Sequence, residues 1–377
     1  MQVPFNKPAY LDLESTYINQ VIKSDHLSGD GEYTKRSTKL LEQLFSVPKA
    51  LITTSCTHAL ELSALLLDIQ PGDEVIIPSF TFVSTVNAFV LRGAKPVFND
   101  IREDTLNMDE RKLEGLITSK TKAIVPVHYA GVGCEMDAIL DIARRYKIHV
   151  VEDNAHGLAG KYRGKNLGTF GYMATQSFHE TKNISCGEGG ALLINDERYS
   201  ERAEIIREKG TNRSRFFRGL VDKYTWVDVG SSYLPSEVLA AILCAQLESV
   251  ESIQKKRREI WMRYQSELCD WAEENGVRLP IIPNYCEQPY HMFYMLMPSL
   301  EKRTDFISTL KEKGIACVFH YLPLNTSDMG LKFGAKSGDC PVTERVSDQL
   351  VRLPFYYNMT EDEQSHVIRE IRKTQMK

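Results

Sequence analysis

Short apolar runs alternate with longer stretches of helical periodicity between residues 49 and 208. Such alternation is typical of parallel strands joined by crossover helices. It predicts strands at 49–53, 74–77, 95–99, 123–128, 149–152 and 191–195. It predicts helices between them at 57–67, 84–92, 137–146 and 198–208. We therefore expect an α/β fold in which a mostly parallel sheet is flanked by helices.

The pattern changes at Pro235, where one long, weakly interrupted helix is predicted from Pro235 to Leu268. Beyond it, the sequence predicts a strand at 291–296 and helices at 306–313 and 361–372. A chain of 377 residues exceeds the size at which one hydrophobic core usually stops growing. We expect a large α/β domain over residues 1–250 and a small α+β domain over residues 251–377.

Charge and hydropathy exclude several classes of protein. The 46 Lys and Arg against 50 Asp and Glu give a net charge of -4 and no basic stripe, so no nucleic acid partner is expected. No stretch approaches the roughly 18 apolar residues of a membrane-spanning helix, and the first residues lack the apolar core of a signal peptide. We expect a cytoplasmic protein without membrane contact. Eight scattered cysteines, with no close pair of zinc-ligand type, predict reduced thiols and no metal site.

Lys182 lies in the run SFHETK, shortly before the glycine-rich run GEGG. Upstream, the strand predicted at 149–152 is followed directly by Asp153. A pyridoxal phosphate enzyme needs an amine for the cofactor aldehyde and a carboxylate for its ring nitrogen. The same amine can then move a proton, as transamination requires. Each residue also has a simpler interpretation, because most loop lysines are solvated and an acid at a strand end often caps the next segment.

Small hydroxyl residues follow the first predicted strand and run directly into a helix. Ser55, Cys56 and Thr57 stand at this junction, where free N–H groups and the helix dipole favour an anion such as phosphate. An ordinary Ser/Thr N-cap explains this segment better when it is judged alone. The other predicted elements of the site, Lys182 and Asp153, shift the balance towards a phosphate site.

Four runs resemble the DegT/DnrJ/EryC1/StrS family of sugar aminotransferases, which use pyridoxal 5'-phosphate: TTSCTHALEL, PSFTFVST, EDNAHG and SFHETK with GEGG. The likeness extends from SGDGEYTKR near the N-terminus to VFHYLPLN and RLPFYYN near the C-terminus. It implies the fold type I architecture of aminotransferases and a homodimer in which both subunits line each site. It also implies that Lys182 binds the cofactor covalently and that Asp153 pairs with the ring nitrogen.

The resemblance assigns further contacts to the cofactor. It implies that Phe82 stacks on one face of the pyridine ring and that Ala155 contacts the other. It implies that Ser177 and the turn at 55–57 hold the phosphate. His156 is expected to hydrogen-bond the ring hydroxyl, with a satisfied structural histidine as the alternative.

One position departs from the wider family, which carries the pattern Gly-x-Asn-x-Arg before the long helix. The run here reads GSSYL, so Ser232 stands at the Asn position and Leu234 at the Arg position. In the family the Asn reaches the cofactor phosphate of the partner subunit. Because serine is shorter, the same contact from Ser232 is left open.

The runs GTNRSRFFRG and VDKYTW resemble a narrower branch that forms dTDP-4-amino-4,6-dideoxygalactose from dTDP-4-keto-6-deoxyglucose. In that branch L-glutamate donates the amine and leaves as 2-oxoglutarate, and the cofactor alternates with pyridoxamine phosphate. The product would serve a bacterial surface polysaccharide. Basic side chains in these runs suit a diphosphate, although a basic loop without a ligand is an equal alternative. The candidates for binding the nucleotide sugar are Arg213, Lys223, His320 and Tyr321.

Three rival functions remain open. A close relative could form the gluco epimer or aminate a 3-keto sugar, but the runs GTNRSRFFRG and GSSYLPSE favour the galacto 4-amino product. A related dehydratase carries histidine at the position of Lys182, so the lysine opposes it. The chain could also be a cofactor-binding sensor without turnover, which the complete set of Phe82, Asp153, His156 and Lys182 argues against.

Overall fold

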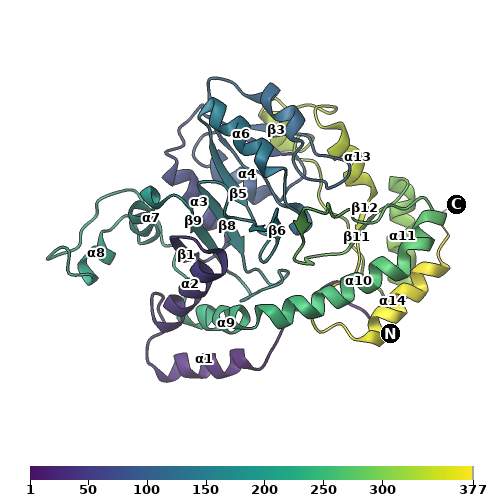
Figure 1. Cartoon of the computed structure of the whole chain (residues 1–377), viewed down its shortest axis with the longest axis horizontal. Coiled ribbons are helices and arrows are strands. Elements are labelled where there is room, and N and C mark those ends of the chain that lie inside the picture. The colour runs from purple at the N-terminus through teal and green to yellow at the C-terminus, as the bar shows by residue number, and fades with distance from the viewer. Residues whose placement is uncertain (376–377) are drawn as a thin grey trace.

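The computed structural model describes residues 1–375, and a seven-stranded sheet lies at its centre (Figure 1). Its strands are β1 (Lys49–Thr53), β2 (Glu74–Pro78), β3 (Lys95–Asn99), β4 (Thr121–Ile124), β5 (His149–Asp153), β8 (Met173–Ser177) and β9 (Gly190–Ile194). They lie in the order β1-β9-β8-β5-β4-β2-β3. Only β9 is reversed, since it pairs antiparallel with β1 and β8 while the other pairs are parallel. The α/β class predicted from the sequence is confirmed.

Helices bury both faces of this sheet. On β5, Val150 packs into the cluster that contains Ile139, whereas Val151 packs into the cluster that contains Leu60 and Phe89. Successive side chains of a strand point to opposite faces, so this division places helices on either side. The helices around the sheet are α3 (Cys56–Leu66), α4 (Val83–Val90), α5 (Glu110–Leu113), α6 (Met136–Tyr146) and α7 (Ser200–Arg207).

The helix predicted from Pro235 to Leu268 is two helices, α9 (Glu237–Glu248) and α10 (Val250–Glu274). Ser249 separates them, with φ -104° and ψ 11°. The helix α9 packs against α1 (Leu13–Lys23) and α2 (Glu32–Phe45), and α10 packs against α14 (Glu361–Lys373). Figure 1 shows α10 running from the sheet side of the molecule to the C-terminal side.

The C-terminal part has a hydrophobic core of its own, in which Trp261, Phe293 and Phe306 are buried. The N-terminal segment joins this core, because Val3 bridges Ile315. The predicted division at residue 250 stays a prediction. The elements of this part are β11 (Tyr294–Leu296), α11 (Leu300–Glu312), α12 (Asp328–Lys332), α13 (Pro341–Gln349) and β12 (Leu350–Arg352), and β11 pairs antiparallel with β12.

Several elements differ from the sequence predictions. The polar strand β8 was not predicted, nor were α1 and α2. The predicted strands at 123–128 and 291–296 are shorter and shifted, at Thr121–Ile124 and Tyr294–Leu296, and the helix at 198–208 begins with a 3-10 turn, η3 (Glu197–Tyr199). Remaining short elements are η1 (Glu114–Leu116), η2 (Tyr129–Gly131) and the small sheet of β6 (Lys161–Tyr162), β7 (Lys165–Asn166) and β10 (Cys286–Glu287).

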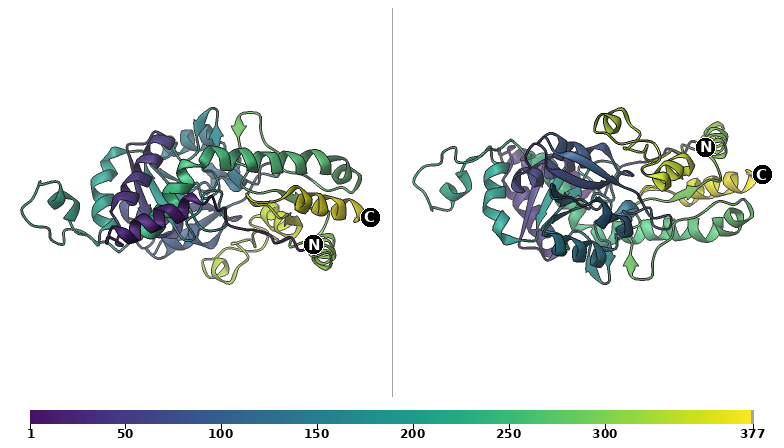
Figure 2. Two further views of the ribbon diagram at one scale, coloured as in Figure 1. Left: turned by 90° about the horizontal axis from the view of Figure 1, so that it is seen from below. Right: turned by 90° about the horizontal axis from the view of Figure 1, so that it is seen from above.

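Residues 209–229 form an arm that stands away from the body of the chain (Figures 1 and 2). The arm contains the short helix α8 (Arg213–Phe217), and a bridge between Thr211 and Trp226 closes its base. Large apolar side chains are exposed on it, with Phe217 at 69% and Trp226 at 75%. Within residues 1–375, no helix combines the length and apolar character needed to cross a membrane.

Candidate active site

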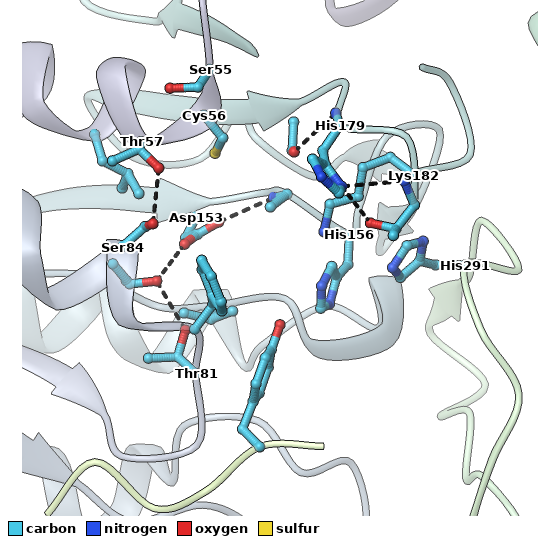
Figure 3. A pocket seen from close by; sticks show the side chains of 18 of the residues that line it. Ser55, Cys56, Thr57, Thr81, Ser84, Asp153, His156, His179, Lys182 and His291 are labelled. Atoms are coloured by element: carbon cyan, nitrogen blue, oxygen red, sulfur yellow. Dashed lines mark hydrogen bonds between the residues drawn. The ribbon is translucent and has the colours of Figure 1, made fainter. Parts of the chain in front are cut away.

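A cavity of about 570 Å³ opens at the carboxyl ends of β1, β2, β5 and β8. Because these strands are mutually parallel, the loops that follow them meet at one edge of the sheet. The cavity therefore gathers residues that are far apart in the sequence (Figure 3). The predicted site residues that line it are Ser55, Cys56, Thr57, Phe82, Asp153, Ala155, His156, Ser177, Lys182, His320 and Tyr321.

Glu152 and Asp153 end β5 but differ in their surroundings. The buried Glu152 carboxylate accepts hydrogen bonds from His128 Nε2 and from the backbone N–H groups of residues 168, 170 and 171, at 2.7 to 2.9 Å. Asp153 lines the cavity and accepts from Thr85 Oγ1 at 2.7 Å and from the backbone N–H of Ala155 at 3.1 Å. Burial raises the pKa of the Asp153 carboxyl. A cationic ring nitrogen beside it would favour its charged form.

Lys182 follows β8 in a turn, where its backbone N–H donates to the carbonyl of His179 at 2.9 Å. Within residues 1–375, no carboxylate forms an ion pair with its ammonium group. Burial lowers the pKa of Lys182 to about 8, and the charge of Arg352 acts in the same direction. About one tenth of the lysine is therefore neutral at pH 7, and only the neutral amine can attack an aldehyde.

His156 stacks on His291, with 4.4 Å between the ring centroids. The backbone N–H of Ala130 donates to His156 Nδ1 at 3.3 Å, which places the proton of the neutral ring on Nε2. Burial holds the pKa of His156 well below its usual range, and the charge of Lys182 adds to this. His156 is therefore a neutral ring with one N–H to donate.

The N-terminus of α3 forms one wall of the cavity. Ser55 caps this helix, since its Oγ accepts from the backbone N–H of His58 at 3.1 Å. Ser55 is thus both the predicted N-cap and part of the cavity lining. The first N–H groups of a helix have no partner inside it, so this turn offers donors to an anion. Gly190 lets β9 approach closely, because a Cβ there would lie 2.3 Å from the carbonyl carbon of Ser55.

Two aromatic side chains, Phe82 and Tyr321, also line the cavity. Phe82 is 56% exposed and lies beside Tyr321, with 6.2 Å between ring centroids. The Tyr129 hydroxyl lies 3.0 Å from His320 Nδ1, and the Tyr129 ring packs edge-on against the Tyr321 ring. These rings give the cavity an apolar side that can receive a flat ligand and keep water from one of its faces.

A model of the DegT/DnrJ/EryC1/StrS aminotransferase family matches residues 11–372 of the chain. The protein belongs to this family. Membership makes the chain an aminotransferase and confirms both the resemblance read from the sequence and the enzyme class.

Individual relatives cover nearly all of the chain. An uncharacterized protein from Methanocaldococcus jannaschii is 36% identical over 98% of this chain and 96% of its own length. The spore coat polysaccharide biosynthesis protein SpsC from Bacillus subtilis is 31% identical, with the same coverage. The solved structure of Spr1654 from Streptococcus pneumoniae in its PLP form has a TM-score of 0.91 and 27% identity, covering 99% of this chain and 98% of that one.

Three residues that were predicted to bind the nucleotide sugar or the cofactor do not line the cavity of their own chain. Arg213 and Lys223 lie on the arm, and Ser232 lies just beyond it, bridged to Glu208. Arg213 pairs with Glu208 at 2.9 Å. Glutamates of α7 also pair with the other two arginines of the arm. The basic run is therefore largely neutralised by its own chain.

The aminotransferase cavity also contains residues that the sequence predictions missed. Thr85 donates a hydrogen bond to Asp153, and His291 stacks on His156. His179 Nε2 lies 3.7 Å from Oε1 of Glu188, within the glycine-rich run. Arg352 reaches the cavity from β12. Thr85 lies in the run PSFTFVST and Arg352 in the run RLPFYYN. The family resemblance included both runs, but these two residues were not predicted as site residues.

Proposed function

We propose that this enzyme transfers the amino group of L-glutamate to C4 of dTDP-4-keto-6-deoxy-D-glucose. The products are dTDP-4-amino-4,6-dideoxy-D-galactose and 2-oxoglutarate. The cofactor is pyridoxal 5'-phosphate, which alternates with pyridoxamine phosphate. The observation that carries the proposal is the presence of the Lys182 amine and the Asp153 carboxylate in one cavity.

The residues of the cavity fit pyridoxal phosphate. The N-terminus of α3 offers donors for a phosphate, and Phe82 is exposed to a flat ring. The neutral His156 has an N–H for the ring hydroxyl, and each Asp153 oxygen keeps a lone pair for the ring nitrogen. Spr1654 from Streptococcus pneumoniae, solved in PLP and PMP forms, supports the same cofactor here. When bound, the cofactor supplies an aldehyde that takes up amino groups and a ring that accepts electrons.

Lys182 is the residue that binds the aldehyde and moves the proton. Its lowered pKa leaves enough neutral amine to attack, and the same amine, once released, can take a proton from the carbon that bears the nitrogen. Asp153, held by Thr85, keeps a negative charge at the ring nitrogen. Phe82 and Tyr321 cover the site and limit access of water.

The nucleotide sugar is assigned to the mouth of the cavity. His320 and Tyr321 line the cavity from within the same chain. Arg213 and Lys223 lie on the arm, so we assign their contacts to the cavity of a second copy in a homodimer. Ser232, beside the base of the arm, is assigned to the second copy's phosphate. The exposed aromatic side chains of the arm support this assembly.

A relative and the cysteines support the biological setting that we propose. SpsC is a spore coat polysaccharide biosynthesis protein, which supports a role in making a deoxyamino sugar for a surface polysaccharide. All eight cysteines lie in the described part of the chain and are free thiols. We place the enzyme in the cytoplasm, because thiols stay reduced there.

The test is to incubate the cofactor-loaded enzyme with L-glutamate and dTDP-4-keto-6-deoxyglucose and to determine the product by NMR. We expect an amine at C4 in the galacto configuration, with 2-oxoglutarate formed in equal amount. The Lys182→Ala variant should form neither compound.

Each other outcome selects a different function. An amine of gluco configuration identifies the epimeric product, and failure with this sugar but turnover of a 3-keto sugar identifies a 3-aminotransferase. A protein that binds the cofactor but leaves its absorbance unchanged with glutamate is a sensor without turnover. Any of these results would contradict the proposed reaction.

A further inference from the structure

Three consecutive backbone carbonyls, at residues 289 to 291, accept hydrogen bonds from buried side chains of two other segments. Asn183 Nδ2 donates to the carbonyl of Pro289 at 2.6 Å. Arg257 of α10 donates through Nε to the carbonyl of Tyr290 at 2.9 Å and through Nη2 to that of His291 at 2.6 Å. Tyr290 has a φ of 52°, a left-handed conformation that residues other than glycine rarely adopt. The two side chains therefore hold this segment in a strained conformation.

The Asn183 side chain also fixes the proton on the His291 ring. Because Asn183 Nδ2 donates to a carbonyl, Oδ1 is the atom that faces His291 Nδ1, at 2.8 Å. An amide oxygen only accepts, so His291 Nδ1 carries the proton and donates it. Burial holds the pKa of His291 well below its usual range, and the charges of Lys182 and Arg257 act in the same direction. His291 is therefore a neutral ring whose tautomer is set by the residue next to Lys182.

His291 in turn supports His156. The two rings stack with 4.4 Å between centroids and 24° between their planes, and both line the cavity (Figure 3). Tyr129 contacts the His156 ring edge-on. The hydrogen bond from the Ala130 N–H to His156 Nδ1 is long, at 3.3 Å, so it constrains the tilt of the ring only weakly. The direction of the His156 Nε2–H therefore depends on the ring of His291.

We propose that His291, held by Asn183, is a positioning residue that orients His156 so that its Nε2–H donates to the cofactor's ring hydroxyl. This inference rests on the proposed binding of pyridoxal phosphate. Asn183 directly follows Lys182. One turn after β8 thus holds the amine and, through His291, the direction of a hydrogen-bond donor. The two belong together because the aldehyde and the hydroxyl are attached to neighbouring carbons of the cofactor.

The first measurement is the pH midpoint at which the visible absorbance of the cofactor-loaded enzyme titrates. A donor to the hydroxyl oxygen stabilises its anion, so the nearby nitrogen of the covalent link to Lys182 binds its proton less tightly. Loss of the donor in His156→Phe should raise the midpoint by about one pH unit, as expected for one hydrogen bond to a charged group. His291→Leu and Asn183→Ala should each raise it by about half as much, because the donor remains but is misaligned.

A double variant separates positioning from general disruption. In His156→Phe the donor is absent, so adding His291→Leu should shift the midpoint no further. His149→Phe is the matched control. His149 also stacks on an aromatic ring, that of Tyr172 at 4.9 Å, but it lies at the opposite end of β5 from Asp153. This control should keep the parental midpoint.

The second measurement needs no cofactor. NMR of the apoprotein with 15N-labelled histidine should show the His291 proton on Nδ1 and the His156 proton on Nε2. Asn183→Ala should release the His291 tautomer, whereas His149→Phe should leave it fixed. Asn183→Ala keeps both rings, so it carries the test should His291→Leu fail to fold.

The outcomes separate this inference from the proposed function. A parental midpoint in Asn183→Ala and His291→Leu, or an added shift in the double variant, would overturn the positioning role. A parental midpoint in His156→Phe would remove the contact with the ring hydroxyl, and the positioning role with it. If the parent binds no pyridoxal phosphate, the proposed function is wrong. NMR then decides the remainder: a His291 tautomer that only Asn183→Ala releases supports the pairing, and one that is mobile in the parent refutes it.

Discussion

Thr85 Oγ1 lies 2.7 Å from Asp153 Oδ2 and donates a hydrogen bond to it within the active-site cavity. Thr81 Oγ1 stands 2.9 Å from the same hydroxyl, so two threonines from the segment after β2 orient one carboxylate at the end of β5. The contact links α4 to the end of β5, although β4 lies between β2 and β5 in the sheet. Among residues 1–375, Thr85 is the only residue whose side chain donates a hydrogen bond to Asp153.

The first prediction concerns this pair. Asp153→Asn preserves the shape of the side chain but removes its charge. Turnover should therefore fall about 100-fold or more, which is the usual cost of removing a preorganised electrostatic group from an active site. Thr85→Val removes one neutral donor and should cost only about fivefold to tenfold in kcat/KM. Steady-state kinetics and cofactor titration measure both effects. A Thr85→Val loss as large as that of Asp153→Asn would contradict an orienting role for the threonine.

The second prediction concerns the pH dependence of cofactor capture. Burial lowers the pKa of Lys182 to about 8, so the neutral amine becomes more abundant as pH rises and reaches its full share above pH 8. At pH 7 about one tenth of the lysine is neutral, compared with well under 0.1% for an ordinary lysine. The rate at which apoprotein captures pyridoxal phosphate should rise about tenfold per pH unit below 8 and then level off.

Stopped-flow absorbance between pH 6 and pH 10, with borohydride reduction and peptide mapping, measures this rate and the residue modified. Lys182→Ala should show no capture at any pH. A rate that continues to rise up to pH 10 would show that the lysine titrates normally.

The third prediction separates two adjacent acids. Glu152→Gln puts an amide where four hydrogen-bond donors converge, so we expect a loss of about 2–4 kcal/mol in the free energy of unfolding. Because Glu152 does not line the cavity, the folded variant should keep its affinity for the cofactor. Urea unfolding and cofactor titration test the two halves. Glu259→Gln on the exposed face of α10 is the control, expected to unfold like the parent.

The fourth prediction concerns the arm at residues 209–229. If its exposed aromatic side chains contact a second copy, Phe217→Ser with Trp226→Ser should weaken the dimer at least about tenfold, because each large apolar side chain contributes on the order of 2 kcal/mol when buried. Analytical ultracentrifugation measures the dissociation constant. Leu300→Ser, at a 46% exposed position on α11, should leave it unchanged. If the double variant dimerises as tightly as the parent, the arm does not lie in the dimer interface.

Much of the α/β fold could be predicted, because most of its strands are apolar runs and the segments between them have the periodicity of helices. The strands at 49–53 and 95–99 match the structure at both ends. The strand β8 could not be found this way, because Thr175 and Gln176 are polar side chains buried in the middle of the sheet. The break at Ser249 was also missed, since apolar residues continue with helical spacing on both sides of it.

The sequence by itself determined that Lys182 and Asp153 are the candidates for holding the cofactor, because each lies next to a short segment with a strong local signal: a glycine-rich run and the end of an apolar strand. Only the tertiary structure decided what surrounds them. His291 and Arg352 enter the cavity from more than 100 residues away, through pairing and packing that no local pattern encodes. The same packing leaves Arg213 outside its own cavity, since burial and contact depend on how distant segments meet.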